Sequence, residues 1–93
     1  DFGEIKTIVK ENVINIFDHT LVINREFSNR AIESLKENFE RIMVVDYQPT
    51  SELLLLDFVK RIKEKLPKGI RLHHLLLRET GTSYAEWFAA DNQ

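Results

Sequence analysis

The 93-residue chain contains no cysteine, so disulfide bonds, thiolate zinc sites and a cysteine nucleophile are excluded within it. Glycine and proline are also scarce, with three and two residues. No repeat, linker or low-complexity segment interrupts the chain. Its length suffices for one domain and is too short for two, so we treat residues 1–93 as a single domain.

Neither sign of charge predominates, because the net charge is only −2. A chain that binds a nucleic-acid backbone normally carries a basic excess, so no nucleic-acid partner is expected. No apolar run approaches the length of a membrane span, and the start lacks the layout of a signal peptide. The sequence therefore predicts a cytoplasmic protein without a membrane partner.

The chain begins with Asp1 and not with methionine. The first three residues are also typical of the exit from an element and not of a natural start. We therefore expect a further segment to precede Asp1, and we interpret the chain as the C-terminal part of a longer domain.

Three segments have apolar residues at the three- and four-residue steps of a helix. They run from Glu4 to Phe17, from Ser28 to Phe39 and from Ser51 to Leu66. Ser28 or Asn29 can cap the second helix, and Thr50 the third. Pro67 and Gly69 should end the third helix.

The third helical segment has an apolar set wider than one stripe, which predicts burial on two sides, against a sheet and another subunit. This set comprises Leu53, Leu54, Leu55, Leu56, Phe58, Val59, Ile62 and Leu66.

Strands are predicted over Ile42–Val45 and Ile70–Leu77, with a further short strand over Tyr84–Phe88. The main elements follow the order helix, helix, strand, helix, strand. Two strands alone make a poor sheet. We therefore expect further strands from a preceding segment or from a neighbouring chain.

Asp18 and His19 stand side by side where the first helical pattern stops. A histidine is favoured at a helix C-terminus by the helix dipole, and an adjacent acid can cap the following turn. Alternatively, Asp18 orients His19 for proton transfer near neutral pH. Adjacent helical residues point about 100° apart, so the pair can serve one site only if the helix breaks there.

Glu79 follows Leu75 and Leu77 on one face of the last predicted strand. Its carboxylate either reaches water at the strand end or is held in a pocket. In a pocket it could accept two parallel N–H groups from a planar ligand such as an aminopyrimidine.

Thr50, Ser51 and Glu52 open the third helix, where they act as a cap or receive a polar ligand. The adjacent His73 and His74 point to opposite faces of a regular strand, so they cannot chelate one ion. No Gly-rich phosphate loop, paired-histidine metal helix or Ser/His/Asp spacing is present.

Four segments, DFGEIK, FDHT, VDYQPTSE and RETGTSYAEW, together resemble the 6-pyruvoyl-tetrahydropterin synthase family. Within it they are most similar to the bacterial 6-carboxytetrahydropterin synthases of queuosine biosynthesis. The resemblance implies an α+β tunnelling fold (T-fold), with an antiparallel sheet, helices packed on one face, and N-terminal strands missing from this chain. It also implies a homo-oligomer, a trimer or hexamer with active sites between subunits.

The resemblance further implies a lyase that acts on the pterin 7,8-dihydroneopterin triphosphate, eliminates triphosphate and, in the queuosine branch, releases acetaldehyde. Asp18 and His19 match the family's proton-transfer pair, which works with a cysteine. Glu79 matches the glutamate that anchors the pterin ring, and Thr50, Ser51 and Glu52 match the segment that lines the pterin pocket. The family's zinc is held by three histidines that lie upstream of Asp1 in the family, as does the cysteine, so no residue of this chain is assigned to the metal.

Two classes of function follow. The first is a zinc-dependent pterin synthase, either 6-carboxytetrahydropterin synthase or 6-pyruvoyl-tetrahydropterin synthase, of which this chain alone should be inactive. The second is a non-catalytic remnant that binds a pterin or purine, or that only builds an oligomer. A histidine-rich strand and a cysteine in an upstream segment would distinguish the first class from the second.

Overall fold

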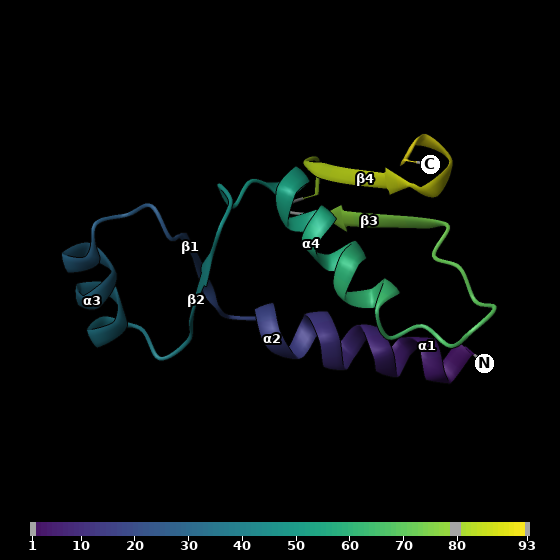
Figure 1. Cartoon of the computed structure of the whole chain (residues 1–93), viewed down its shortest axis with the longest axis horizontal. Coiled ribbons are helices and arrows are strands. Elements are labelled where there is room, and N and C mark those ends of the chain that lie inside the picture. The colour runs from purple at the N-terminus through teal and green to yellow at the C-terminus, as the bar shows by residue number, and fades with distance from the viewer. Residues whose placement is uncertain (1, 79–80, 93) are drawn as a thin grey trace.

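The computed structural model describes residues 2–78 and 81–92. The molecule is elongated, with extents of 45 × 26 × 25 Å (Figure 1). Its elements, in chain order, are α1 (Phe2–Val9), η1 (Lys10–Ile14), α2 (Asn15–Phe17), β1 (Leu21–Asn24), α3 (Asn29–Asn38), β2 (Ile42–Val45), α4 (Ser51–Lys63), β3 (His74–Arg78), β4 (Tyr84–Phe88) and η2 (Ala89–Asn92).

The elements α1, η1 and α2 follow one another without a break and form one continuous helix, here called the first helix (Figure 1). Its end at Phe17 agrees with the sequence prediction, and its start lies two residues before the predicted Glu4. The middle turn, η1, is wound as a π-helix. Val13 of this turn is buried and joins the core.

The caps predicted for the other two helices are confirmed. The Ser28 hydroxyl accepts a hydrogen bond from the Ala31 N–H at 3.1 Å, and the Thr50 hydroxyl accepts one from the Leu53 N–H at 3.3 Å. The end predicted for α4 at Leu66 is wrong, because the helix stops at Lys63. Pro67 disfavours a helical backbone at the residue before it, which explains why the last turn is not completed.

Replacing Thr50 with alanine should destabilise the protein by about 1 kcal/mol, because the Leu53 N–H loses its acceptor at the start of α4. Urea unfolding at neutral pH measures this loss. Thr50→Ser keeps the hydroxyl and serves as the matched control. Equal stability of the alanine and serine variants would show that the cap contributes nothing.

The strands β3 and β4 form an antiparallel hairpin in which Leu75 lies opposite Trp87 and Leu77 lies opposite Ala85. The prediction that the strand begins at Ile70 is wrong, since β3 begins at His74. Its partner explains the late start: β4 ends at Phe88, opposite His74, and the chain then turns into η2. Residues 70–73 therefore have no strand beside them within the described hairpin.

A second pair of strands, β1 and β2, is parallel, with Leu21 opposite Ile42 and Asn24 opposite Val45. The strand at Ile42–Val45 was predicted correctly, but β1 was not predicted, so the expected element order is wrong at this point. The parallel partner of β1 lies beyond α3 in the chain, so the residues next to β1 do not indicate the pairing. Figure 1 shows α3 at one end of the molecule, beyond this strand pair.

The core lies around α4, which packs on two sides. On one side, Leu55 and Val59 pack against Ala85 and Trp87 of the hairpin. On the other side, two α4 side chains pack against the first helix, and these are Phe58 and Ile62. α4 is therefore buried on two sides, as inferred, but the second partner is the first helix of the same chain, where another subunit was expected.

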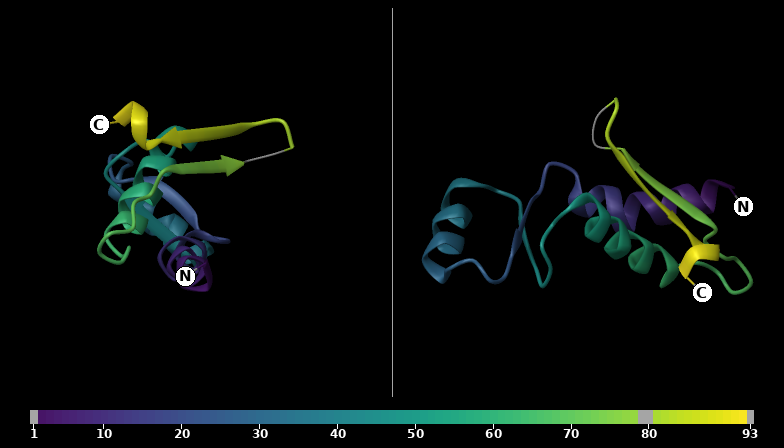
Figure 2. Two further views of the ribbon diagram at one scale, coloured as in Figure 1. Left: turned by 90° about the vertical axis from the view of Figure 1, so that its right-hand side faces the viewer. Right: turned by 90° about the horizontal axis from the view of Figure 1, so that it is seen from above.

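The fold is α+β, as predicted. The hairpin, α4 and the first helix form successive layers, so that both helices lie on one face of the hairpin (Figure 2). Within residues 2–78 and 81–92, no helix has both the length and the apolar composition needed to cross a membrane. Two large apolar side chains of α4 remain exposed, Leu53 by 37% and Leu56 by 48%.

Candidate functional site

The Asp18–His19 pair lies on a sharp corner where the first helix ends. Asp18 has an extended backbone, and His19 lies in the left-handed region with a φ of 57°. The corner is closed by Thr20, whose N–H donates to the Phe17 carbonyl at 3.1 Å and whose hydroxyl donates to the Ile16 carbonyl at 2.8 Å. The helix therefore breaks at the point where one site for both side chains requires it.

Both side chains of this pair are accessible to solvent and close to one another. The His19 Nε2 lies 3.6 Å from the Asp18 Oδ2, and the side chains are 87% and 61% exposed. A carboxylate at this distance can orient the imidazole ring. The geometry is suited to proton exchange with a ligand that covers the corner, and the catalytic role of the pair stays a prediction.

Arg41, the residue just before β2, binds to the end of the first helix at the same corner. Its Nη2 donates to the carbonyl oxygens of Asn15 and Ile16, the latter at 3.1 Å. Carbonyl groups in the last turn of a helix lack partners within that helix, and a cation there also complements the helix dipole. The Arg41 carbonyl in turn accepts the Leu21 N–H at 2.9 Å, so the segments before and after the corner are tied to β2.

The second predicted group, Thr50, Ser51 and Glu52, lies at the N-terminus of α4. Thr50 caps the helix, and Glu52 is exposed and lines a groove of about 360 Å³ beside Ala85 and Trp87 of β4. Between described residues, no hydrogen bond or ion pair joins this group to Asp18 or His19. Within the described part of the chain, the two predicted groups are thus not linked by direct polar contacts.

The predicted pterin anchor, Glu79, lies outside the described residues, so its placement stays a prediction. The described residues on either side of it are connected, since the Arg78 Nη1 donates to the Gly81 carbonyl at 3.4 Å.

His74 has partners on the outer face of the hairpin. Its Nε2 lies 2.8 Å from the Glu86 Oε2, and its ring stacks on Phe88 with centroids 4.5 Å apart. His73 precedes the strand, and its carbonyl accepts the Ala89 N–H at 2.9 Å. Among residues 2–78 and 81–92, no group of three or more histidine, aspartate or glutamate side chains is placed to hold a metal ion.

A partly buried polar network, which was not predicted from the sequence, lies between α4 and the segment after β2. The Asp57 carboxylate accepts hydrogen bonds from the Tyr47 hydroxyl and from the Arg61 Nε, the latter at 2.8 Å. The Arg61 guanidinium lies over the Phe17 ring, 4.8 Å from its centroid. Four residues separate Asp57 and Arg61, and this helical spacing of opposite charges was a signal that could have indicated the pair.

Burial and the hydrogen bond to Asp57 raise the pKa of the Tyr47 hydroxyl above its ordinary value. The folded protein therefore binds this proton more tightly than the unfolded chain does. The resulting stability is fully present below about pH 10, the ordinary pKa of tyrosine, and is lost as the pH rises above it.

Tyr47→Phe should therefore lower the free energy of unfolding at pH 7 by about 1 kcal/mol, because Asp57 loses one donor. The difference from the wild type should shrink as the pH rises above about 10. Urea unfolding across this pH range measures both effects, with Tyr84→Phe as the control, since Tyr84 is 56% exposed. A difference that is the same at both ends of the range would contradict the assignment.

The fold and the corner together define an α+β domain in which an exposed acid–imidazole pair ends the first helix. A family comparison agrees with the sequence resemblance: the 6-pyruvoyl tetrahydropterin synthase family matches residues 1–90. The chain belongs to this family of pterin synthases, whose members are lyases. Comparisons with curated proteins and with solved structures gave no significant match.

Proposed function

We propose that the protein is a cytoplasmic 6-carboxytetrahydropterin synthase-like lyase of the queuosine pathway, acting on 7,8-dihydroneopterin triphosphate. The observation that carries this proposal is the Asp18–His19 pair, which the helix break exposes on one corner in a chain of this family. The ring nitrogens of His19 can accept and return protons of the substrate side chain, and Asp18 stabilises the imidazolium formed in between.

The remaining predicted residues would bind the substrate. Glu79 would accept two N–H groups of the pterin ring, which fixes the ring plane relative to the reacting side chain. Thr50, Ser51 and Glu52 would line the pterin pocket at the start of α4. Ring anchoring and proton transfer are thus assigned to different segments of the chain.

We further propose that the site assembles between subunits of a trimer or hexamer. Two observations support this arrangement. The corner and the start of α4 share no hydrogen bond or ion pair between described residues, so a neighbouring copy can bring the two groups together. Leu53 and Leu56 also leave apolar surface exposed close to the start of α4.

The zinc expected for the family does not fit the described part of this chain, which places no three ligands together. No step is therefore assigned to a metal. Zinc enters the proposal only as an ion held by residues other than those described, and metal analysis of the purified protein tests it.

Incubation of the purified full-length protein with 7,8-dihydroneopterin triphosphate tests the proposal. The expected products are triphosphate, acetaldehyde and 6-carboxytetrahydropterin. Formation of 6-pyruvoyl-tetrahydropterin without acetaldehyde would assign the protein to the other branch of the family. Pterin binding without any turnover would refute the lyase and indicate a non-catalytic pterin-binding protein.

A further inference from the structure

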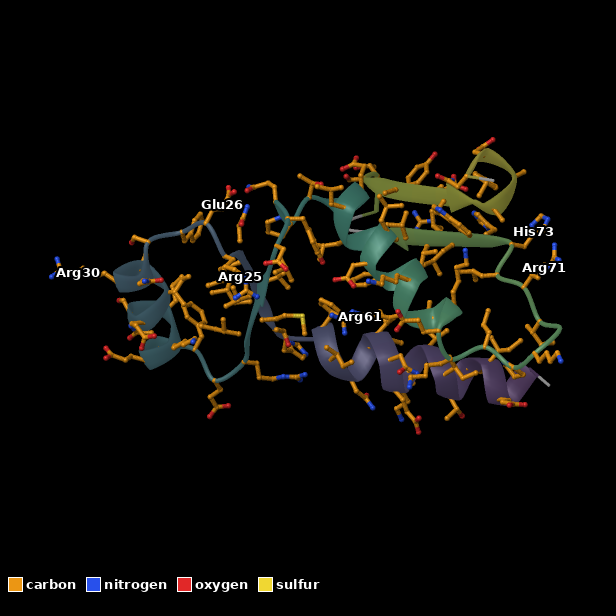
Figure 3. The ribbon with its side chains drawn as sticks, in the orientation of Figure 1. Arg25, Glu26, Arg30, Arg61, Arg71 and His73 are labelled. Atoms are coloured by element: carbon orange, nitrogen blue, oxygen red, sulfur yellow. The ribbon has the colours of Figure 1, made fainter. Side chains whose placement is uncertain are left out.

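Arg61 extends from α4 to the end of the first helix, where it contacts Phe17 (Figure 3). Its side chain is 32% exposed, and its partner Asp57 is 14% exposed. The same guanidinium donates to the Met43 sulfur at 3.8 Å and covers the Phe17 ring. Arg61 therefore contacts β2 and the last residue of α2 at once.

Phe17 is held from two sides. The Phe58 ring of α4 meets it edge-on, with centroids 4.7 Å apart, and the Arg61 guanidinium lies over it. Phe17 directly precedes Asp18, and its carbonyl accepts the Thr20 N–H that closes the corner. A shift of the Phe17 ring would therefore move the backbone on which Asp18 and His19 stand.

The guanidinium of Arg61 is itself fixed by hydrogen bonds. Asp57 accepts from its Nε, and Tyr47 donates to the other oxygen of the same carboxylate. A planar guanidinium can donate in its plane while its face covers an aromatic ring, whereas a lysine ammonium is a compact charge without a planar face to lay on the ring. The contact with Phe17 thus depends on an arginine whose orientation Asp57 determines.

We propose that Arg61 is a positioning residue that keeps the Asp18–His19 corner in the geometry for proton transfer. The inference rests on the proposed function of the pair. Because α4 carries Thr50, Ser51 and Glu52 at its start and Arg61 in its third turn, one helix ties the predicted pterin pocket to the proton-transfer corner. Arg61 does not touch the substrate in this scheme and acts only through Phe17.

The test is steady-state turnover of 7,8-dihydroneopterin triphosphate by the full-length protein, with rates normalised to the folded fraction. Arg61→Ala should lower kcat about tenfold or more, because small displacements of reacting groups are costly, while KM changes less than about twofold. Arg61→Lys should fail to restore kcat, since it keeps the charge but not the planar contact. Lys60→Ala, the exposed neighbour on α4, is the matched control and should keep the wild-type kcat.

Phe17→Leu leaves the pair of Arg61 and Asp57 in place. It therefore tests the positioning role of Arg61 even if Arg61→Ala does not fold. It should lower kcat in the same way, and the double variant should lose little more than the larger single effect, because both residues act through one contact.

His19→Ala separates failure of this inference from failure of the proposed function. If it abolishes turnover while Arg61→Ala and Phe17→Leu retain the kcat of Lys60→Ala, the positioning role is wrong and the proposed function stands. If Arg61→Lys restores the full rate, the planar contact is not needed and the inference is overturned. If His19→Ala retains full turnover, both are overturned.

Discussion

Replacing His19 should lower the turnover of 7,8-dihydroneopterin triphosphate by about 100- to 10,000-fold, the contribution typical of a positioned general acid or base. An imidazole can both accept and donate a proton, and the Asp18 carboxylate lies 3.6 Å from that of His19. Asp18→Asn should cause a smaller loss, because the ring remains while its charge partner is gone. Single-turnover kinetics on folded protein measure both losses.

The backbone at His19 requires a second variant as a control. With a φ of 57°, this position disfavours alanine, whereas asparagine tolerates the left-handed region better. His19→Ala should therefore lose both stability and turnover, and His19→Asn should lose turnover with less loss of stability. Wild-type turnover in His19→Asn would show that the imidazole is not needed.

Replacing Glu79 with alanine should weaken pterin binding by about 30- to 150-fold, corresponding to about 2–3 kcal/mol for the loss of charge-assisted hydrogen bonds. The ring would lose the acceptor for two parallel N–H groups. Glu79→Gln, which keeps one acceptor oxygen, should show a smaller loss. Calorimetric titration with a pterin measures the affinity.

The exposed Glu64 provides the matched control for Glu79, since Glu64→Ala removes a carboxylate from a different part of the surface. Unchanged pterin affinity in Glu79→Ala, relative to Glu64→Ala, would refute the anchoring role. The pterin pocket would then have to be sought elsewhere on the protein.

The local parts of the fold were predictable because they depend on neighbouring residues. The caps at Ser28 and Thr50 and the end of the first helix at Phe17 follow from side chains within a few positions of each helix end. The two-sided burial of α4 also follows from its own apolar pattern, which is wider than a single stripe. These predictions needed no knowledge of the partners.

The features that the sequence did not predict depend on distant partners. The strand β1 exists because Leu21–Asn24 meets Ile42–Val45, which lies beyond α3 in the chain. The start of β3 at His74 is determined by the end of β4 and not by the apolar residues of the segment before it. Pairing of this kind has no local signature.

Only the local part of the candidate site was predictable from the sequence. The position of Asp18 and His19 at a helix break follows from where the periodicity stops, and the structure adds the left-handed turn at His19. The role of Arg61 could not be foreseen, because its contact with Phe17 joins residues that lie far apart in the sequence. Only the Asp57 and Arg61 spacing indicated that this face of α4 carries a charge pair.

Release of triphosphate from 7,8-dihydroneopterin triphosphate is the most direct test of a pterin-forming lyase, because both branches of the family share this step. Wild-type protein should release triphosphate in step with consumption of the substrate, and His19→Asn should reduce the rate about 100-fold or more. Absence of release by the wild type, or equal rates in the two proteins, would contradict the assignment of proton transfer to the Asp18–His19 corner.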